Sequence, residues 1–340
     1  MKSKTFLAAL VCCLCLGFAT EAAAASWRVN NDKRANANFL DLNAAMGNVS
    51  NGDTLYVDKA TTFSSIQYMT KTVTVIGPGY FIGENDADEA YFSNTVYIQA
   101  EGVKLTGLHL SNVTIRHNKA IIERCRVTGN IMATETNYDA DDCSIRSCFI
   151  KGCIMGQGQD GTDGWNILNN IFYLSFNGNL INNFYNVLID HNTFNMQFYN
   201  YYPTAIGDQI WSSTITNNIA YQGYTQRFCF YCGNPTSDNT IEHNVMNTSM
   251  EYSANHPNNT IDEKFQLDSF FTGTGGNQER DAFYESNYEG SDAGAFSGAY
   301  PYVMNGYPLY VPRFESVNVP SQPDANGNLR VNLVIKNQNK

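Results

Sequence analysis

The chain has 340 residues, a formal net charge of −11 and 43% hydrophobic residues. A strongly acidic chain is not attracted to nucleic acid or to anionic lipid, so these two classes of partner are excluded. The 21 tyrosines, 20 phenylalanines and 26 glycines, together with only 16% charged residues, favour a β-rich extracellular domain.

The N-terminal segment has the pattern of a secretory signal peptide. Two lysines precede an apolar run from Phe6 to Ala19, and small residues follow as far as Ala25. The run is too short to cross a bilayer comfortably, so we expect cleavage after Ala25 and no membrane span. The sequence therefore predicts a signal peptide over 1–25 and a protein that is secreted or held at the cell surface.

Six cysteines follow this segment, which are Cys125, Cys143, Cys148, Cys153, Cys229 and Cys232. An even number in an exported protein permits three disulfides, although the spacing does not assign the pairs. Cys229 and Cys232 form a CxxC pair, which keeps zinc as an alternative. The second pair that a structural zinc site would need is missing from the sequence.

A repeated pattern begins in the first third of the chain. The segments "NILNNIF", "LIDHNTF", "TITNNIA" and "TIEHNVM" are copies of it, and the spacing between successive copies is 17 to 26 residues. With the first apolar residue of each copy as position zero, the copies start at Leu105, Ile122, Ile145, Ile167, Ile189, Ile215 and Ile241. A period of this length indicates stacked structural units.

Three further positions of the repeat form columns. Position plus three holds Leu108, Cys125, Cys148, Asn170, Asn192, Asn218 and Asn244. Position plus five holds Leu110, Val127, Ile150, Phe172, Phe194, Ala220 and Met246. Position plus nine holds Ile131, Ile154, Phe176, Phe198, Tyr224 and Met250 in the last six copies.

Short apolar alternations without a helical period predict a coil of short strands, with each coil stacked on the last about 4.8 Å away. The columns then line one continuous core. We expect Asn170, Asn192, Asn218 and Asn244 to occupy tight bends in the left-handed conformation and to stack as an amide ladder. Cys125 and Cys148 would continue this column as buried small residues, stacked thiols or a strained bridge.

The chain resembles secreted bacterial right-handed parallel β-helix proteins of the pectin-lyase-like superfamily. The segment "WRVNNDKRANANFLDLNAAMGNVSNGDTLYVDKATT" is similar to the opening of that family, and "TVTVIGPGYFIGEN" to its second strand region. The segments "DEKFQLDS" and "EGSDAGAFSG" are similar to its closing elements. The resemblance implies an all-β chain: a single-stranded right-handed parallel β-helix with an N-terminal helical cap and an irregular C-terminal covering region.

The two ends of such a helix need covering, since an open edge invites aggregation. Phe39, Leu42 and Ala45 fall at helical spacing, which predicts a capping helix around 37–47. The repeat fades after residue 250. We therefore expect a capped β-helix over 26–250, and over 251–340 a covering region with a final strand near Val331, Leu333 and Ile335.

Enzymes of this superfamily act on polysaccharides, with a Lys or Arg base in lyases and paired carboxylates in hydrolases. Asp141 and Asp163 both stand at position minus four, and Asp142 is adjacent to Asp141, so these three are the catalytic candidates. Calcium is the one cofactor that the pattern admits, with Asp141, Asp160 and Asp163 as candidate ligands. A solvated Asp/Gly turn explains the same residues.

The basic candidates lie on two consecutive coils, at Arg124, Arg126, Arg146 and Lys151. Glu123 shares its column with Arg146, so a surface ion-pair network explains the group without catalysis. No Lys or Arg occurs from Cys153 to Gln226, and half of the coiled body thus lacks the groups that bind uronates.

Aromatic residues are dense in "QFYNYYP" and around Trp211. Tyrosine and tryptophan combine an apolar face with a polar edge, which suits sugar rings or partner proteins. The candidate ligand-binding residues are Tyr199, Tyr201, Tyr202 and Trp211, against the alternative of loop packing.

Three hypotheses follow for the function. The first is a monomeric, non-catalytic scaffold, free of cofactor, that binds extracellular polysaccharide or another surface molecule. The second is a polysaccharide lyase or glycoside hydrolase that uses Asp141, Asp142 and Asp163. The third is an adhesin-like structural protein.

Overall fold

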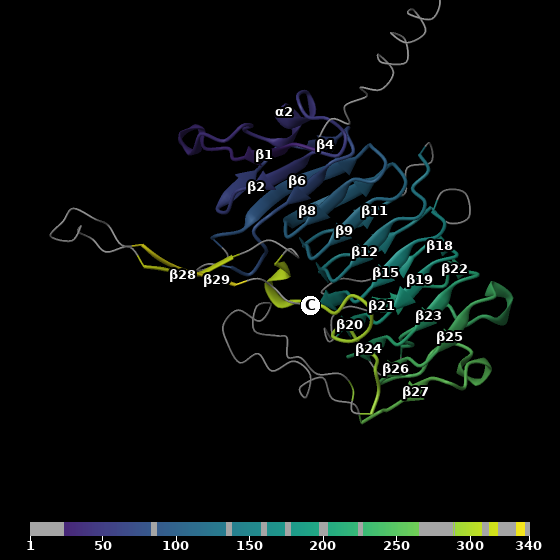
Figure 1. The fold of residues 1–340 in the computed structure, drawn as a ribbon. Coiled ribbons are helices and arrows are strands. Elements are labelled where there is room, and N and C mark those ends of the chain that lie inside the picture. Colours follow the sequence, from purple (N-terminus) through teal and green to yellow (C-terminus); the bar gives the residue numbers. More distant parts are fainter. Residues whose placement is uncertain are drawn as a thin grey trace, which may run out of the picture.

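The computed structural model describes residues 24–82, 87–133, 138–157, 162–173, 178–196, 203–223, 227–264, 288, 290–307, 313–318 and 331–336. In these residues the chain is the all-β parallel β-helix that the sequence predicts (Figure 1). The expected signal peptide over 1–25 lies almost wholly outside the described residues. No helix in the described part is long and apolar enough to span a membrane.

Each coil contributes short strands to three faces. The first face contains β1 (Ser26–Val29), β2 (Thr54–Val57), β5 (Thr74–Ile76), β7 (Lys104–Thr106), β9 (Ile121–Glu123), β12 (Ser144–Arg146), β15 (Asn166–Leu168), β19 (Leu188–Asp190), β23 (Thr214–Thr216) and β25 (Thr240–Glu242). All its strand pairs are parallel, and the position-zero residues from Leu105 to Ile241 pair in one unbroken register.

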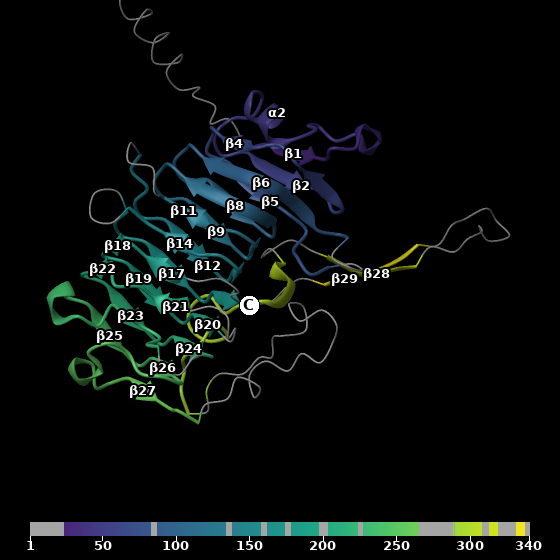
Figure 2. The same ribbon diagram turned by 180° about the vertical axis from the view of Figure 1, so that it is seen from behind.

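The second and third faces belong to one continuous sheet because β6 (Ala90–Ile98) and β8 (His109–Ile115) run through both. The second face adds β3 (Thr61–Phe63), β10 (Arg126–Val127), β13 (Phe149–Ile150), β16 (Ile171–Tyr173), β20 (Thr193–Met196), β24 (Ile219–Gln222), β26 (Val245–Met246) and β27 (Thr260–Ile261). The third face adds β4 (Gln67–Met69), β11 (Ile131–Met132), β14 (Ile154–Met155), β17 (Gly178–Asn182) and β21 (Pro203–Ile206); Figure 2 shows it from behind.

The core consists of the predicted apolar columns, with one correction. Positions zero and plus five are in register throughout, and their side chains are buried. The plus-nine column is wrong beyond Ile154, which pairs with Ile181, and Ile181 in turn pairs with Ile206. The later coils have longer connections before the third face, so a fixed offset from position zero no longer finds the inward residue. Phe176, Phe198 and Tyr224 lie outside the described residues.

The N-terminal end is capped by a short helix, α2 (Leu42–Met46). It occupies only the second half of the expected range 37–47, because Asp41 caps its start by accepting from the Ala44 N–H. Leu42 and Ala45 are buried against the first coils, as the helical spacing predicts. Phe39 instead forms a β-bridge with Val29.

A ladder of buried amides runs along the bend between the first and second faces. From Asn192 onward, each Oδ1 accepts from the backbone N–H and the Nδ2 of the asparagine one coil earlier, at 2.9–3.0 Å. Each Nδ2 also donates to the position-zero carbonyl of the preceding coil. The members are Asn170, Asn192, Asn218 and Asn244, as their spacing predicts, and Asn259, which continues the stack beyond residue 250.

In the two coils before Asn170, cysteines occupy position plus three, where the later coils have the ladder asparagines. The Cys148 N–H donates to Asn170 Oδ1, and its thiol donates to the Ile122 carbonyl, which is the acceptor that an amide Nδ2 uses elsewhere. All six cysteines after residue 25 are buried and free. Burial raises the pKa of Cys143 and of Cys148 to about 12, so both remain thiols. In the described residues neither a disulfide nor a zinc cluster forms.

The C-terminal region covers the coils from outside. Residues 290–307, which we call the strap, run back along the stack from the Asn217 coil to Tyr80 (Figure 1). The strap packs on outward apolar side chains of the second face, including Phe149, Ile171 and Ile219. The final strand, β29 (Asn332–Lys336), pairs antiparallel with β28 (Arg313–Asn318) and forms a separate hairpin.

The remaining helical elements are single 3₁₀ turns. These are η1 (Lys33–Ala35), η4 (Pro235–Ser237), η5 (Ser253–Asn255) and η7 (Met304–Gly306). The turn η4 lies beside the two-stranded sheet of β18 (Phe184–Tyr185) and β22 (Ile210–Trp211), because the Ser212 N–H donates to the Ser237 carbonyl.

Candidate functional site

Each three-residue strand of the first face is flanked by two left-handed bends, with φ between 48° and 70° in the coils from residue 102 onward. The bend before the strand, at position minus three, uses Gly102, Lys119, Asp142, Gly164, Asn186, Ser212 and Asp238. The bend after it, at position plus two, uses Gly107, Arg124, Ser147, Asn169, His191, Asn217 and His243.

The expectation that the ladder asparagine itself is left-handed is therefore wrong. The residue just before it makes the turn, because the ladder side chain must point inward to stack on its neighbours. Asn, Asp and Gly are the residues that tolerate this conformation most easily, which explains their frequency at both positions.

The strap covers the second bend. Asn169 donates from Nδ2 to the carbonyls of Ala295 and Ser297, and Ser147 Oγ donates to the Tyr300 carbonyl at 2.7 Å. Further contacts follow at Asn217, whose carbonyl accepts from the Gly294 N–H, and at Arg124, which donates to the Tyr307 carbonyl. The side chains of Arg124, Ser147 and Asn169 therefore hold the strap in place.

His191 is the one plus-two side chain between two carboxylates. Its Nδ1 lies 2.7 Å from Asp190, its Nε2 lies 3.7 Å from Asp292 of the strap, and Gly298 packs on the ring. Burial alone would lower the His191 pKa, but Asp190 and then Asp292 outweigh it and the pKa is raised. The histidine thus links the first face to the strap.

Two of the basic candidates, Arg124 and Arg146, lie beneath this cover. Arg146 pairs with Glu123 at 2.7 Å and packs against the ring of Tyr300, while Lys104 pairs with the other Glu123 oxygen at 2.6 Å. Burial raises the pKa of Glu123, but the two cations more than offset it and the pKa is lowered. The expected ion pair between Arg146 and Glu123 is therefore present, but it is largely buried and not part of a surface network.

Arg126 belongs to a second buried group. Its guanidinium lies 3.2 Å from Glu89 and over the ring of Phe81, and His109 Nδ1 also contacts Glu89. Glu89 directly precedes β6, so this buried group links β6, β8 and β10 of the second face, and Arg126 does not face a groove.

The first bend, at minus three and minus four, stays open. The minus-four column contains Asp141, Asp163, Tyr185 and Trp211, and Tyr185 pairs in register with both Asp163 and Trp211. The catalytic candidates and the aromatic candidate therefore belong to one line along the helix axis. Sequence reasoning noticed the two acids at this position and did not follow the column two coils further.

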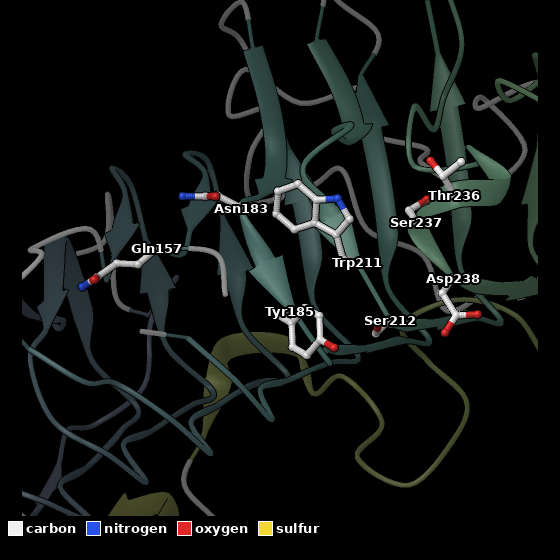
Figure 3. Close-up of a pocket in the computed structure, with 8 residues that line it drawn as sticks. All are labelled: Gln157, Asn183, Tyr185, Trp211, Ser212, Thr236, Ser237 and Asp238. Atoms are coloured by element: carbon white, nitrogen blue, oxygen red, sulfur yellow. The ribbon is translucent and has the colours of Figure 1, made fainter. Parts of the chain in front are cut away.

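A cleft of about 380 Å³ lies at the aromatic end of this column (Figure 3). Tyr185 and Trp211 are in its centre, with Gln157 and Asn183 toward one side and Thr236, Ser237 and Asp238 toward the other. Ser212, which makes the left-handed bend, completes the lining. Asp238 is the only charged side chain among these residues, and the rest of the rim offers amides and hydroxyls.

The acidic candidates lie on earlier coils of the same column. Asp141 Oδ1 accepts from the Asp163 N–H at 3.0 Å, and the Asp142 N–H donates to the Asp163 carbonyl. Asp142 and Asp163 are exposed and Asp141 is half-buried. The carboxylate of Asp141 therefore stabilises the bend of the next coil by accepting a backbone hydrogen bond. This is the role that the alternative of an Asp/Gly turn gives it.

Some candidates lie outside the described residues, namely Asp160, Tyr199, Tyr201 and Tyr202. Among the described residues no group of three His, Cys, Asp or Glu side chains could hold a metal ion. A smaller hollow of about 280 Å³ is lined by residues of the last coils, including Met250, His256 and Ile261, and its lining contains no aromatic ring apart from the imidazole. Trp211 is thus the one sequence-predicted ligand residue that the structure places in a cleft.

No protein-family model matches the sequence, and no curated protein matches it.

The sequence interpretation missed Tyr185, Asn183, Gln157 and Asp238. Tyr185 and Asp238 have a clear sequence signal, because they stand at minus four and minus three of their copies. Gln157 and Asn183 have no such signal. The connections before the first-face strands vary in length, so these two residues do not stand at a fixed offset from position zero.

Proposed function

We propose that the protein binds polysaccharide without cleaving it, on the open bend of a secreted β-helix of the pectin-lyase-like type. The observation that carries the proposal is the cleft in which Tyr185 and Trp211 lie side by side, surrounded by amide and hydroxyl groups.

The chemistry of this cleft suits a sugar. A pyranose ring has an apolar face, which packs on Tyr or Trp, and hydroxyl groups around its edge. Asn183 Nδ2 donates to the Gly156 carbonyl and the Thr236 hydroxyl donates to Asn234 Oδ1, so Asn183 Oδ1 and the Thr236 oxygen can accept hydrogen bonds from such an edge. Pockets of about 300–1,000 Å³ with a few placed polar groups are typical of small-ligand sites.

The charge distribution favours uncharged or basic glycans over uronates. The cleft lining includes no Lys, Arg or His. From residue 152 to residue 263 the sequence has one cation, Arg227, and nine Asp or Glu residues. A polyuronate would meet like charge along this half of the molecule, which costs affinity.

The contacts of the catalytic candidates support binding rather than cleavage. Asp141 already accepts a backbone hydrogen bond, and Arg124, Arg126 and Arg146 are engaged by the strap or by buried carboxylates. A lyase base or a hydrolytic acid–base pair needs groups that face the substrate.

Titration calorimetry with purified protein tests the proposal. The panel consists of soluble β-glucan, xylan, mannan, chitosan and polygalacturonate, and unsaturated products and reducing ends are measured in parallel. We expect binding to at least one neutral or basic polymer, no binding to polygalacturonate, and no products.

The matched variants are Trp211→Ala and, as a control, Phe228→Ala, which removes an exposed ring outside the cleft. Truncating a central aromatic residue should cost about 2 kcal/mol of binding free energy, or roughly 30-fold in Kd. Equal affinities for both variants and the wild type would contradict the proposed site. Product formation that disappears in Asp141→Asn or Asp163→Asn would contradict the non-catalytic role.

A further inference from the structure

We propose that the bound glycan continues beyond the cleft, along a row of side chains on the third face that ends at Tyr68. This inference rests on the proposed function and adds the class of ligand, which is a long polymer rather than a short oligosaccharide. The row consists of Tyr68, Tyr97, Arg116 and Tyr138.

The members of the row contact one another in sequence. Tyr68 of β4 and Tyr97 of β6 are stacked, with ring centroids 5.3 Å apart and planes at 18°. The Arg116 guanidinium lies 4.2 Å from the Tyr97 centroid and 5.1 Å from that of Tyr138. Rings and a planar guanidinium thus form a continuous platform.

The platform joins the cleft through Gln157. Its Nε2 donates to the Tyr138 carbonyl at 3.1 Å, and its side chain lines the cleft beside Asn183. Five strand steps separate β4 from β17 on this face, which corresponds to about 24 Å. Such a span exceeds the length of a short oligosaccharide.

The outer rings are exposed although they are large and partly apolar. Tyr68 is 39% exposed and Tyr138 is 42% exposed. On the third face the column that starts with Tyr68 and Tyr97 continues through Thr114 to Met132 and Met155, and both methionines are half-buried. Exposed rings and partly exposed methionines on one face are typical of an interaction site. Because this surface is continuous with the cleft, we assign the same glycan chain to both.

Chain length provides the test. Affinities are measured for the polymer and the trisaccharide of each neutral glycan in the panel: β-glucan, xylan and mannan. We expect the polymer to bind more tightly than the trisaccharide. Tyr68→Ala and Tyr138→Ala should each weaken polymer binding roughly fivefold, since a ring contact contributes about 1 kcal/mol, and should leave trisaccharide binding unchanged.

Tyr56→Ala is the matched control, because Tyr56 is also 39% exposed but lies on β2 of the first face. Polymer affinity unchanged in both row variants, or lowered equally by Tyr56→Ala, would overturn the inference and leave the proposed function intact. If the wild-type protein binds neither the polymers nor the trisaccharides of the neutral glycans, this inference is overturned. The proposed function would then be supported only if the protein binds chitosan. Loss of trisaccharide binding in Trp211→Ala reports on the cleft independently of the row.

Discussion

The two bends of the first face have the same left-handed backbone conformation, and Gly, Asn and Ser occur at both, but their surroundings differ. At plus two, Ser147, Asn169 and His191 are covered by the strap and hold it. At minus three and minus four, Trp211 and Asp238 line an open cleft. The comparison shows that the chemistry of a bend does not by itself reveal its role. What covers the bend decides whether its polar side chains stabilise the fold or are available to a ligand.

The largest expected effect lies in the amide ladder behind the covered bend. Asn192→Leu removes the acceptor of both the Asn170 N–H and the Asn170 Nδ2. Each buried group left unsatisfied costs about 1–3 kcal/mol. We therefore expect the free energy of unfolding, from urea titration, to fall by at least about 2 kcal/mol.

Asn259→Leu is the control for this variant, because Asn259 ends the described ladder and is only half-buried. It should cost clearly less than Asn192→Leu. Equal costs at the two positions would show that the ladder does not act as a buried chain.

The next effect concerns the fit of the strap on the covered bend. A Cβ added at Gly298 would lie 2.8 Å from His191 Cγ, so Gly298→Ala must displace the strap or the ring. Gly290→Ala introduces a methyl group at a similar positive φ with nothing within 4 Å. Both variants share the backbone strain, and Gly298→Ala should cost about 1–3 kcal/mol more.

Thermal and urea unfolding of the two glycine variants measure this difference directly. A Gly298→Ala protein as stable as the Gly290→Ala protein would mean that the strap does not press on His191.

A smaller effect follows from the titration of His191. Its pKa is raised by Asp190 and Asp292 despite burial, so its stabilising contribution is complete below about pH 6.5 and is lost as the pH rises through the folded-state pKa. Compared with His191→Asn, which also tolerates the left-handed bend, the wild type should lose its advantage as the pH rises above about 6.5.

The size of this loss should stay below about 1 kcal/mol, because Asp292 is largely exposed and solvent screens its 3.7 Å contact with His191. The Asp190 pKa is lowered: burial raises it, and its hydrogen bonds with His191, Asn217 and Thr216 outweigh burial. Its contribution is therefore lost on the acid side, as the pH falls through that pKa. A stability difference that does not vary from pH 6 to 8 would contradict the role of His191 as a link to the strap.

The smallest change is expected at the open bend. Asp238 is exposed and left-handed, and Asn adopts that conformation as readily. Asp238→Asn should leave the melting temperature unchanged and should weaken chitosan binding a few-fold while sparing neutral glycans. A fall in melting temperature comparable to that of Gly298→Ala would remove the contrast between the two bends.

Much of the fold was predictable because apolar residues that recur at fixed positions of a repeat indicate a stacked core. The register of Leu105 through Ile241 and the stacking of Asn170 to Asn244 follow from one counting rule. The plus-nine column failed because connection lengths vary before the third face, and Ile181 cannot be found by a fixed offset. The path of the strap was not predictable, since its contacts with Asn169 and Ser147 join residues more than 100 positions apart.

The candidate site was predictable only in part. Trp211 was recognised as an aromatic residue of the right kind, and Asp141 and Asp163 as residues of one column. Their shared line with Tyr185 needed the same counting rule carried two coils further. Gln157 needed the structure, because nothing in its neighbourhood repeats.

The central claim is that the open bend binds ligand while the covered bend holds the fold. Hydrogen–deuterium exchange, with and without the polysaccharide that binds most tightly, tests both bends in one measurement. The account predicts ligand-induced protection in peptides that contain 183–186, 211–213 and 236–239, and unchanged exchange at 169, 191 and 290–300. Protection confined to the strap and the plus-two residues, with none around Tyr185 and Trp211, would contradict it.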